Sequence, residues 1–173
     1  MIYFSDPIAA KSELRQLFAE AIVAWGDSAP VRFREESSGW DFQIAMSHAD
    51  NCSPWGCTLA KAFFPDCGRH DLLLFPKLFT QTRKEIVDTF IHETGHIFGL
   101  RHFFAKLSEK AWPSEIFGRH EKFSIMIYGL FSELSKYDRE DLRRLYESVW
   151  NGSLDNVNGT PIVQFKPFHY ALP

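Results

Sequence analysis

The sequence predicts an α+β fold, and three observations lead to this prediction. The chain has 173 residues, the length of one ordinary domain. Apolar residues recur at helical spacing near the start of the chain, in its middle and again beyond residue 135. Between the first two helical stretches lie short runs of alternating apolar and polar residues, as in strands. The order of helix, strands, helix, loop and helix is typical of an α+β domain.

The first predicted helix covers residues 7–25. Ser5 and Asp6 offer an N-cap, a proline occupies the first helical position, and Gly26 follows as a stop signal. Beyond this helix a turn at residues 65–68 separates the last two of four predicted strands. These strands cover residues 31–35, 42–46, 58–64 and 71–75.

A second helix is predicted from Thr82 to Gly99, because Thr82 and Glu85 have the spacing of a capping box and an apolar stripe follows. Proline and glycine interrupt the pattern between residues 101 and 123, which predicts a loop.

A third helix is predicted after Ser135, where Asp138 completes another capping box. The tail from Asn151 is rich in Gly, Asn and Pro, but it also contains several large apolar side chains. We therefore expect the tail to pack back onto the domain.

Composition and charge exclude several classes of function. The chain has 19 Lys and Arg against 22 Asp and Glu, a net charge of −3, which excludes a basic nucleic-acid binder that depends on phosphate contacts. No run approaches the roughly 18 apolar residues of a membrane-spanning helix, and residues 1–4 are too short for a signal-peptide core. We expect a monomer with no nucleic-acid or membrane partner.

Three cysteines, Cys52, Cys57 and Cys67, lie close together in the sequence, and a single disulfide would leave one thiol over. A strand between Cys57 and Cys67 would hold their Cα atoms roughly 20 Å apart, too far for a disulfide, which spans at most about 6.8 Å. Cys52 can meet Cys57 through a short turn or fold across to Cys67. We favour Cys52–Cys57 with Cys67 free; a zinc site of three cysteines with His48 or His70 is a further alternative.

Three Asn-x-Ser/Thr triplets begin at Asn51, Asn151 and Asn158. This is the acceptor pattern for N-glycosylation, and it favours a secreted product. Coincidence is the alternative, and Pro161 disfavours the last site. We expect an extracellular protein whose signal sequence and any propeptide are absent from this chain.

The candidate catalytic and metal-binding residues lie in one stretch, H-E-T-G-H-I-F-G-L-R-H, which begins at His92. Residues four apart lie on one face of a helix, about 6 Å apart, so His92 and His96 can bind one Zn²⁺. Glu93 is rotated away from both and lies where a general base is needed. Gly99 permits a left-handed helix end, after which His102 can supply a third nitrogen. Three neutral ligands leave a fourth position for water, as in catalytic zinc sites; ordinary buried histidines are the alternative.

This stretch resembles the extended motif H-E-x-x-H-x-x-G-x-x-H of the metzincin clan of zinc endopeptidases. Residues 124–128 resemble the Met-turn of the clan, which places Met126 beneath the zinc. The resemblance implies one catalytic domain over residues 1–173, with three helices, a small twisted mixed sheet and one catalytic Zn²⁺. Residues 1–99 would form a subdomain with the sheet and the active-site helix, and residues 100–173 one with the Met-turn, a helix and the packed tail.

Within the clan, residues 59–65 resemble the edge strand of the matrixins, the matrix metalloproteinases, and residues 134–146 their C-terminal helix. The edge strand would pair with an extended substrate, unless it is an ordinary edge strand. By this resemblance the substrate cleft is lined by Leu59, Ala60, Lys61, Ala62, Ile127 and Leu130.

The sequence departs from the matrixin pattern at three places. Phe103 follows the third histidine, where matrixins have Ser or Thr. Tyr128 has the placement seen in astacins and serralysins; it would assist the developing oxyanion, bind zinc or pack in the cleft wall. Matrixins also bind a structural zinc, and His48 and Asp50 match two of its ligands, but Lys61 and a leucine pair replace the others. We therefore expect one zinc ion and a disulfide in place of the second.

The function predicted from these residues is zinc-dependent cleavage of peptide bonds in a protein or peptide substrate. Glu93 is the predicted general base that takes a proton from the metal-activated water and passes it to the departing amine. The alternatives are a zinc hydrolase of the same fold that acts on a non-peptide amide, and a non-catalytic binding module that retains the fold.

Overall fold

The computed structural model describes residues 7–66, 68, 70–108, 114–119, 121–127, 131–165 and 170–171. Its helices are α1 (Pro7–Trp25), the 3₁₀-helix η1 (Pro76–Thr80), α2 (Arg83–Ile97), α3 (Ala105–Ser108) and α4 (Lys136–Trp150). Its strands are β1 (Gly39–Trp40), β2 (Gln43–Met46), β3 (Asn51–Ser53), β4 (Gly56–Thr58), β5 (Ala60–Lys61), β6 (Asp71–Leu74), β7 (Asn156–Val157), β8 (Thr160–Pro161) and β9 (Tyr170–Ala171). Within the described ranges, no helix has the length and apolar character needed to cross a membrane.

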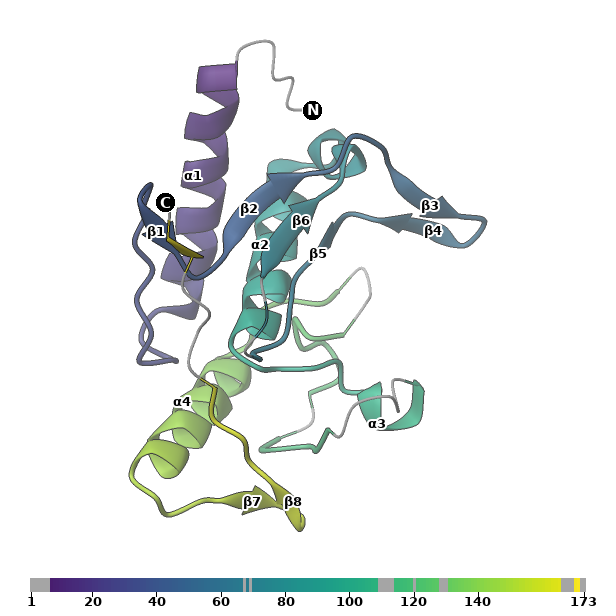
Figure 1. Ribbon diagram of the computed structural model, residues 1–173. Coiled ribbons are helices and arrows are strands. Elements are labelled where there is room, and N and C mark those ends of the chain that lie inside the picture. Colours follow the sequence, from purple (N-terminus) through teal and green to yellow (C-terminus); the bar gives the residue numbers. More distant parts are fainter. Residues whose placement is uncertain are drawn as a thin grey trace.

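A three-stranded mixed sheet lies in front of α2, and α4 lies below both long helices (Figure 1). The strand order is β2-β6-β5, with β2 parallel and β5 antiparallel to β6. Leu72 and Leu74 of β6 are fully buried, as expected for a central strand whose apolar side chains face the core. β5 pairs with β6 along one side only, so it forms an edge of this sheet.

The core forms where α1 packs against α2, and the spacing of apolar residues explains why both segments are helical. Leu17, Ala21 and Trp25 recur along one face of α1 and are buried together with Ile86 of α2. The indole Nε1 of Trp25 donates to the carbonyl of Ile91 at 2.9 Å, which satisfies a polar atom that would otherwise be costly to bury. α1 therefore supports α2 immediately before its first histidine.

The predicted strand at residues 31–35 is wrong: residues 31–36 have no regular secondary structure. The alternation there has another cause, because Phe33 turns inward against Phe18 and Phe42 while its neighbours are exposed. Arg15 of α1 holds the following Glu35 with two hydrogen bonds. One partly buried aromatic ring between exposed neighbours thus imitates the pattern of a strand.

The predicted strand at residues 58–64 is also only partly right, because only Ala60 and Lys61 pair with β6. Beyond them the chain leaves the sheet: Phe63 stacks on His70, and Phe64 approaches His96 edge-on. The contact of Phe64 with His96 places the end of this segment beside α2.

The cysteine expectation is confirmed for one pair, since Cys52 and Cys57 form a disulfide across the antiparallel pair β3–β4. Two thiols are therefore consumed, and the alternative of a three-cysteine zinc site is wrong. Cys67 lies outside the described residues. Asp50 accepts a hydrogen bond from the backbone N–H of Lys77 at 2.6 Å and so anchors the start of η1.

The second half of the chain differs from expectation in one respect and agrees in another. The region predicted as a loop, residues 101–123, contains the one-turn helix α3, so the described part of the chain has four α-helices and not three. The tail packs back as expected: β9 pairs antiparallel with β1, and β7 and β8 form a hairpin beside α4 (Figure 1).

Candidate active site and metal centre

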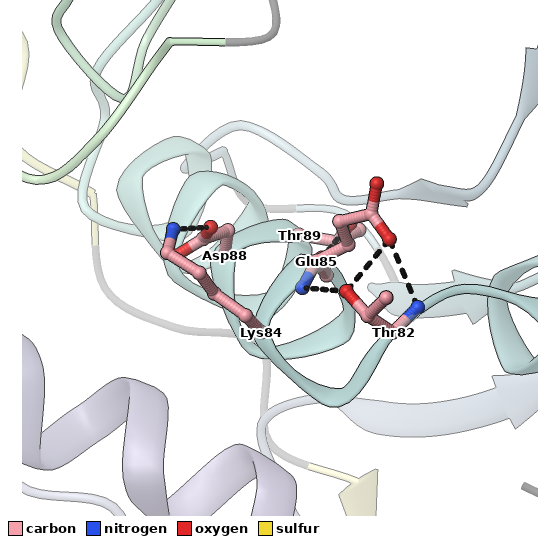
Figure 2. Close-up of polar contacts among 5 residues, drawn as sticks. All are labelled: Thr82, Lys84, Glu85, Asp88 and Thr89. Carbon is pink, nitrogen blue, oxygen red and sulfur yellow. Dashed lines mark hydrogen bonds and ion pairs between the residues drawn. The ribbon is translucent and has the colours of Figure 1, made fainter. Parts of the chain in front are cut away.

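The site is built on α2, whose first turn is closed by a capping box (Figure 2). The N–H of Glu85 donates to the hydroxyl of Thr82, and the carboxylate of Glu85 accepts from the N–H of Thr82 at 2.9 Å. Lys84 pairs with Asp88 one turn later, and the hydroxyl of Thr89 donates to the carbonyl of Glu85. The predicted helix start is therefore confirmed, and it fixes which residues face the core further along.

His92 and His96 lie one helical turn apart on the buried face of α2. Nδ1 of His92 donates to the carbonyl of Ile125 at 2.6 Å, and Nδ1 of His96 donates to the carbonyl of Leu100 at 2.8 Å. A carbonyl oxygen can only accept, so each ring carries its proton on Nδ1 and keeps a lone pair on Nε2. Such bonds also orient histidines that bind metals.

The end of α2 explains how a third histidine reaches the same place. Gly99 has a φ of 92°, the left-handed conformation that the sequence predicts. Its N–H donates to the carbonyl of His96 at 2.9 Å, and the N–H of Leu100 donates to that of Gly95 at 2.9 Å. These two bonds define a Schellman motif, which reverses the chain and returns His102 to the helix.

The three histidines meet through their Nε2 atoms. Nε2 of His92 lies 3.1 Å from that of His96 and 3.2 Å from that of His102. Two nitrogens bound to one tetrahedral zinc ion at about 2.0–2.1 Å are about 3.3 Å apart, so these two separations match those of zinc ligands. Among the described residues, these three side chains form the group of His, Cys, Asp or Glu whose ligand atoms gather for a metal, within 4.8 Å of one another.

Burial lowers the pKa of His92 to about 4, and the charge of His102 acts in the same direction. The hydrogen bond to the carbonyl of Ile125 opposes this shift. Desolvation therefore keeps the ring in the neutral form that a metal requires.

Glu93 lies beside the histidines but points to a different element. It is 7% exposed, and its Oε2 accepts a hydrogen bond from the N–H of Ala62 at 2.7 Å. Burial raises the pKa of Glu93 to about 7, and the bond from Ala62 opposes the rise. A buried carboxylate that ionises near neutrality has the property of a general base, and here the edge of the sheet holds it in place.

Met126 packs directly beneath the histidine helix. It is 2% exposed, and a Cβ placed on Gly95 would lie 2.5 Å from its Sδ. The glycine between His92 and His96 thus permits a close approach that no other residue allows. The Met-turn that the sequence predicts is consistent with this contact.

Ser124 holds the segment that carries Met126. It is fully buried; its hydroxyl donates to Asp138 at 2.6 Å and accepts from the N–H of Met126 at 3.1 Å. Asp138 also completes the capping box of α4, because it accepts from the N–H of the N-cap residue Ser135. The start of α4 therefore holds the segment of residues 124–126. The carbonyl of Ile125 in this segment accepts the hydrogen bond from Nδ1 of His92.

Two aromatic rings complete the surroundings of the histidines. Phe64 meets His96 edge-on with ring centroids 5.0 Å apart, and Phe104 stacks on His102 at 4.8 Å. Neither ring follows from the sequence pattern, because both lie in irregular segments. The sequence offered one signal for each ring: Phe104 lies two residues after His102, and Phe64 lies in the predicted edge segment, residues 59–65.

The predicted cleft residues are only partly described. Ala60 is buried, Leu59 and Ala62 pack partly buried against the core, and Lys61 is exposed. Ile127 is half-buried, and its carbonyl accepts from the hydroxyl of Ser132 at 2.6 Å. Tyr128 and Leu130, the other two predicted site residues, lie outside the described residues.

The geometry brings together three histidines able to hold a metal ion, two of them on α2, beside a buried carboxylate. Similar sequences among known proteins add to this description. The chain is 31% identical to rat macrophage metalloelastase over 111 residues, which are 58% of this chain and 24% of that protein. It is 33% identical to rat stromelysin-3 over 103 residues and to human stromelysin-3 over 104 residues, in each case 53% of this chain and 21% of the relative.

These relatives are matrix metalloproteinases, and the chain spans about a quarter or less of their length. No family model matches the chain. The similarity and the histidine triad together support a matrixin-like metalloprotease region.

Proposed function

We propose that this chain is the catalytic domain of a zinc-dependent endopeptidase of the matrixin type, formed by residues 1–173 with subdomains 1–99 and 100–173. The observation that carries the proposal is the convergence of the Nε2 atoms of three histidines beside a buried glutamate. The similarity to matrix metalloproteinases supports it.

His92, His96 and His102 would hold a single zinc ion as neutral nitrogen ligands, with Met126 packed beneath. Bound zinc would polarise the scissile carbonyl and lower the pKa of a water molecule to about 7. The chain itself keeps the ligand rings fixed through the carbonyls of Ile125 and Leu100.

Glu93 acts as the general base in this proposal. Its carboxylate takes a proton from the attacking water and delivers it to the nitrogen of the departing amine. Its burial supports this role, because burial raises the pKa of the Glu93 carboxyl and so favours the uptake of a proton. The N–H of Ala62 holds the carboxylate while it changes charge.

The substrate binds along β5, the edge strand, by adding an extended segment to its free side. Ala60 and Lys61 of this strand line the cleft together with the flanking Leu59 and Ala62, and Ile127 and Leu130 line it from the segment after Met126. The hydrogen bond from the N–H of Ala62 to the carboxylate of Glu93 supports this placement, because it holds the end of β5 close to the proposed general base. The enzyme is secreted and monomeric.

Tyr128 is proposed to donate its hydroxyl to the oxyanion that forms on the scissile carbonyl. Tyr128→Phe keeps the ring and removes one donor, so we expect a lower kcat with little change in KM, measured by steady-state hydrolysis of a fluorogenic peptide. An unchanged kcat would assign the ring to the wall of the cleft instead.

The proposed function is tested by mass-spectrometric mapping of cleavages in a peptide library. We expect internal peptide bonds to be cut, cleavage to stop after treatment with a chelator, and zinc alone to restore it. Intact peptides combined with zinc-dependent hydrolysis of a non-peptide amide would contradict peptidase activity, and no hydrolysis of either would contradict an enzyme.

A further inference from the structure

The hairpin formed by β3 and β4 presents one large apolar side chain at its tip. Trp55 is 96% exposed, although burying a tryptophan is among the largest apolar gains available to a chain. Residues 51–58 contain no charged side chain, and all but Cys57 are exposed. The hairpin therefore contributes almost nothing to the core.

The tip is nevertheless held in a fixed shape. The disulfide joins Cys52 to Cys57, which are directly opposite one another in the register of the two strands. The hydroxyl of Ser53 accepts from the N–H of Trp55 and donates to the carbonyl of Gly56, each at 3.2 Å. A rigid aromatic anchor loses little conformational entropy on binding, which favours a docking role.

The position of the hairpin indicates what docks there. Only Leu59 separates β4 from β5, so the hairpin lies at the start of β5. It projects there on the side of the free edge of β5 (Figure 1). A polypeptide that pairs antiparallel with β5 runs toward the hairpin at its carboxyl end. Seven residues separate Trp55 from Ala62, which lies beside Glu93, so the two residues are at most roughly 23 Å apart.

We propose that Trp55 is a substrate-docking residue for the part of an extended polypeptide about five to eight residues beyond the scissile bond. The inference rests on the proposed function and deepens it, since it makes long or unfolded polypeptides with apolar residues on that side the favoured substrates. A lipid surface fits less well, because stable membrane attachment needs a second signal and this hairpin offers one tryptophan without basic neighbours.

The test uses two fluorogenic peptides with the same cleavage sequence from the library. The short peptide ends two residues after the scissile bond, and the long one continues for eight residues in which leucine alternates with serine. We expect kcat/KM to be about tenfold higher for the long peptide, the size of an interface hot spot. Trp55→Ser should remove this advantage and leave the short peptide unaffected.

Trp150→Ser is the matched control, because Trp150 is 57% exposed on α4, far along the chain from the edge strand. It should keep the full advantage of the long peptide, and circular dichroism should show that both variants are folded. Equal cleavage of both peptides by the wild-type protein, or an advantage that survives Trp55→Ser, overturns the inference alone. Cleavage of neither peptide overturns the proposed function and the inference with it.

Binding to vesicles of phosphatidylcholine and phosphatidylserine distinguishes the membrane alternative. We expect the wild-type protein and Trp55→Ser to sediment equally little with such vesicles. Vesicle binding that Trp55→Ser abolishes, without any change in the dependence on peptide length, would assign the tip to membranes and overturn docking of substrate.

Discussion

Glu93→Gln is expected to lower kcat by about 10²–10⁴-fold, the contribution of a general base. The amide has nearly the shape of the carboxylate, and its oxygen can still accept the hydrogen bond from the N–H of Ala62. Only the ability to take up a proton is lost. The rate is measured with the peptide identified in the library, and bound zinc is measured by atomic absorption on the same sample, where we expect no loss.

The matched control is Glu85→Gln, which makes the same chemical change on the same helix. Glu85 closes the capping box of α2, and glutamine serves in that position as well as glutamate. This variant should retain wild-type activity. A Glu93→Gln protein that digests peptide at near wild-type speed would remove Glu93 from the proposed chemistry.

Gly95→Ala is expected to lower the free energy of unfolding by about 1 kcal/mol, although alanine in a helix normally stabilises it by about that amount. The new Cβ would lie 2.5 Å from Sδ of Met126 and 3.3 Å from a ring carbon of Trp25. Overpacking of this kind costs about 1–3 kcal/mol and outweighs the gain in helix propensity. Urea unfolding of the two proteins, with equal m-values, measures the difference.

A double-mutant cycle separates this clash from other causes. In the background of Met126→Ala the two contacts with Met126 are gone and only the 3.3 Å approach to the ring of Trp25 remains, so the substitution Gly95→Ala should cost clearly less stability. An equal loss of stability in both backgrounds would show that Met126 does not restrict residue 95.

Local sequence signals predicted much of the fold. Both capping boxes, at Thr82 and Ser135, are present, because a cap depends on residues only three apart. The left-handed end at Gly99 has the same local origin. The Cys52–Cys57 disulfide also closes a short turn, and strand geometry alone disfavoured the pairing of Cys57 with Cys67.

The contacts that hold the site together were beyond sequence reasoning because they join distant segments. The carbonyl of Ile125 meets His92 across 33 positions, and the N–H of Ala62 meets Glu93 across 31. A backbone atom has no residue-specific signature, so neither partner can be recognised in the sequence. The strand predicted at residues 31–35 failed for a related reason. The ring of Phe33 contacts the distant Phe18, and this single contact produced an alternation that resembles a strand.

X-ray absorption at the zinc edge, with metal analysis of the purified protein, tests the central claim most directly. We expect one zinc ion per chain, with three nitrogen ligands and one oxygen ligand at about 2.0–2.1 Å, and loss of the ion in His102→Ala. A sulfur ligand at about 2.3 Å, or a His102→Ala protein that keeps the zinc ion with unchanged ligands, would contradict the assignment of the site to His92, His96 and His102.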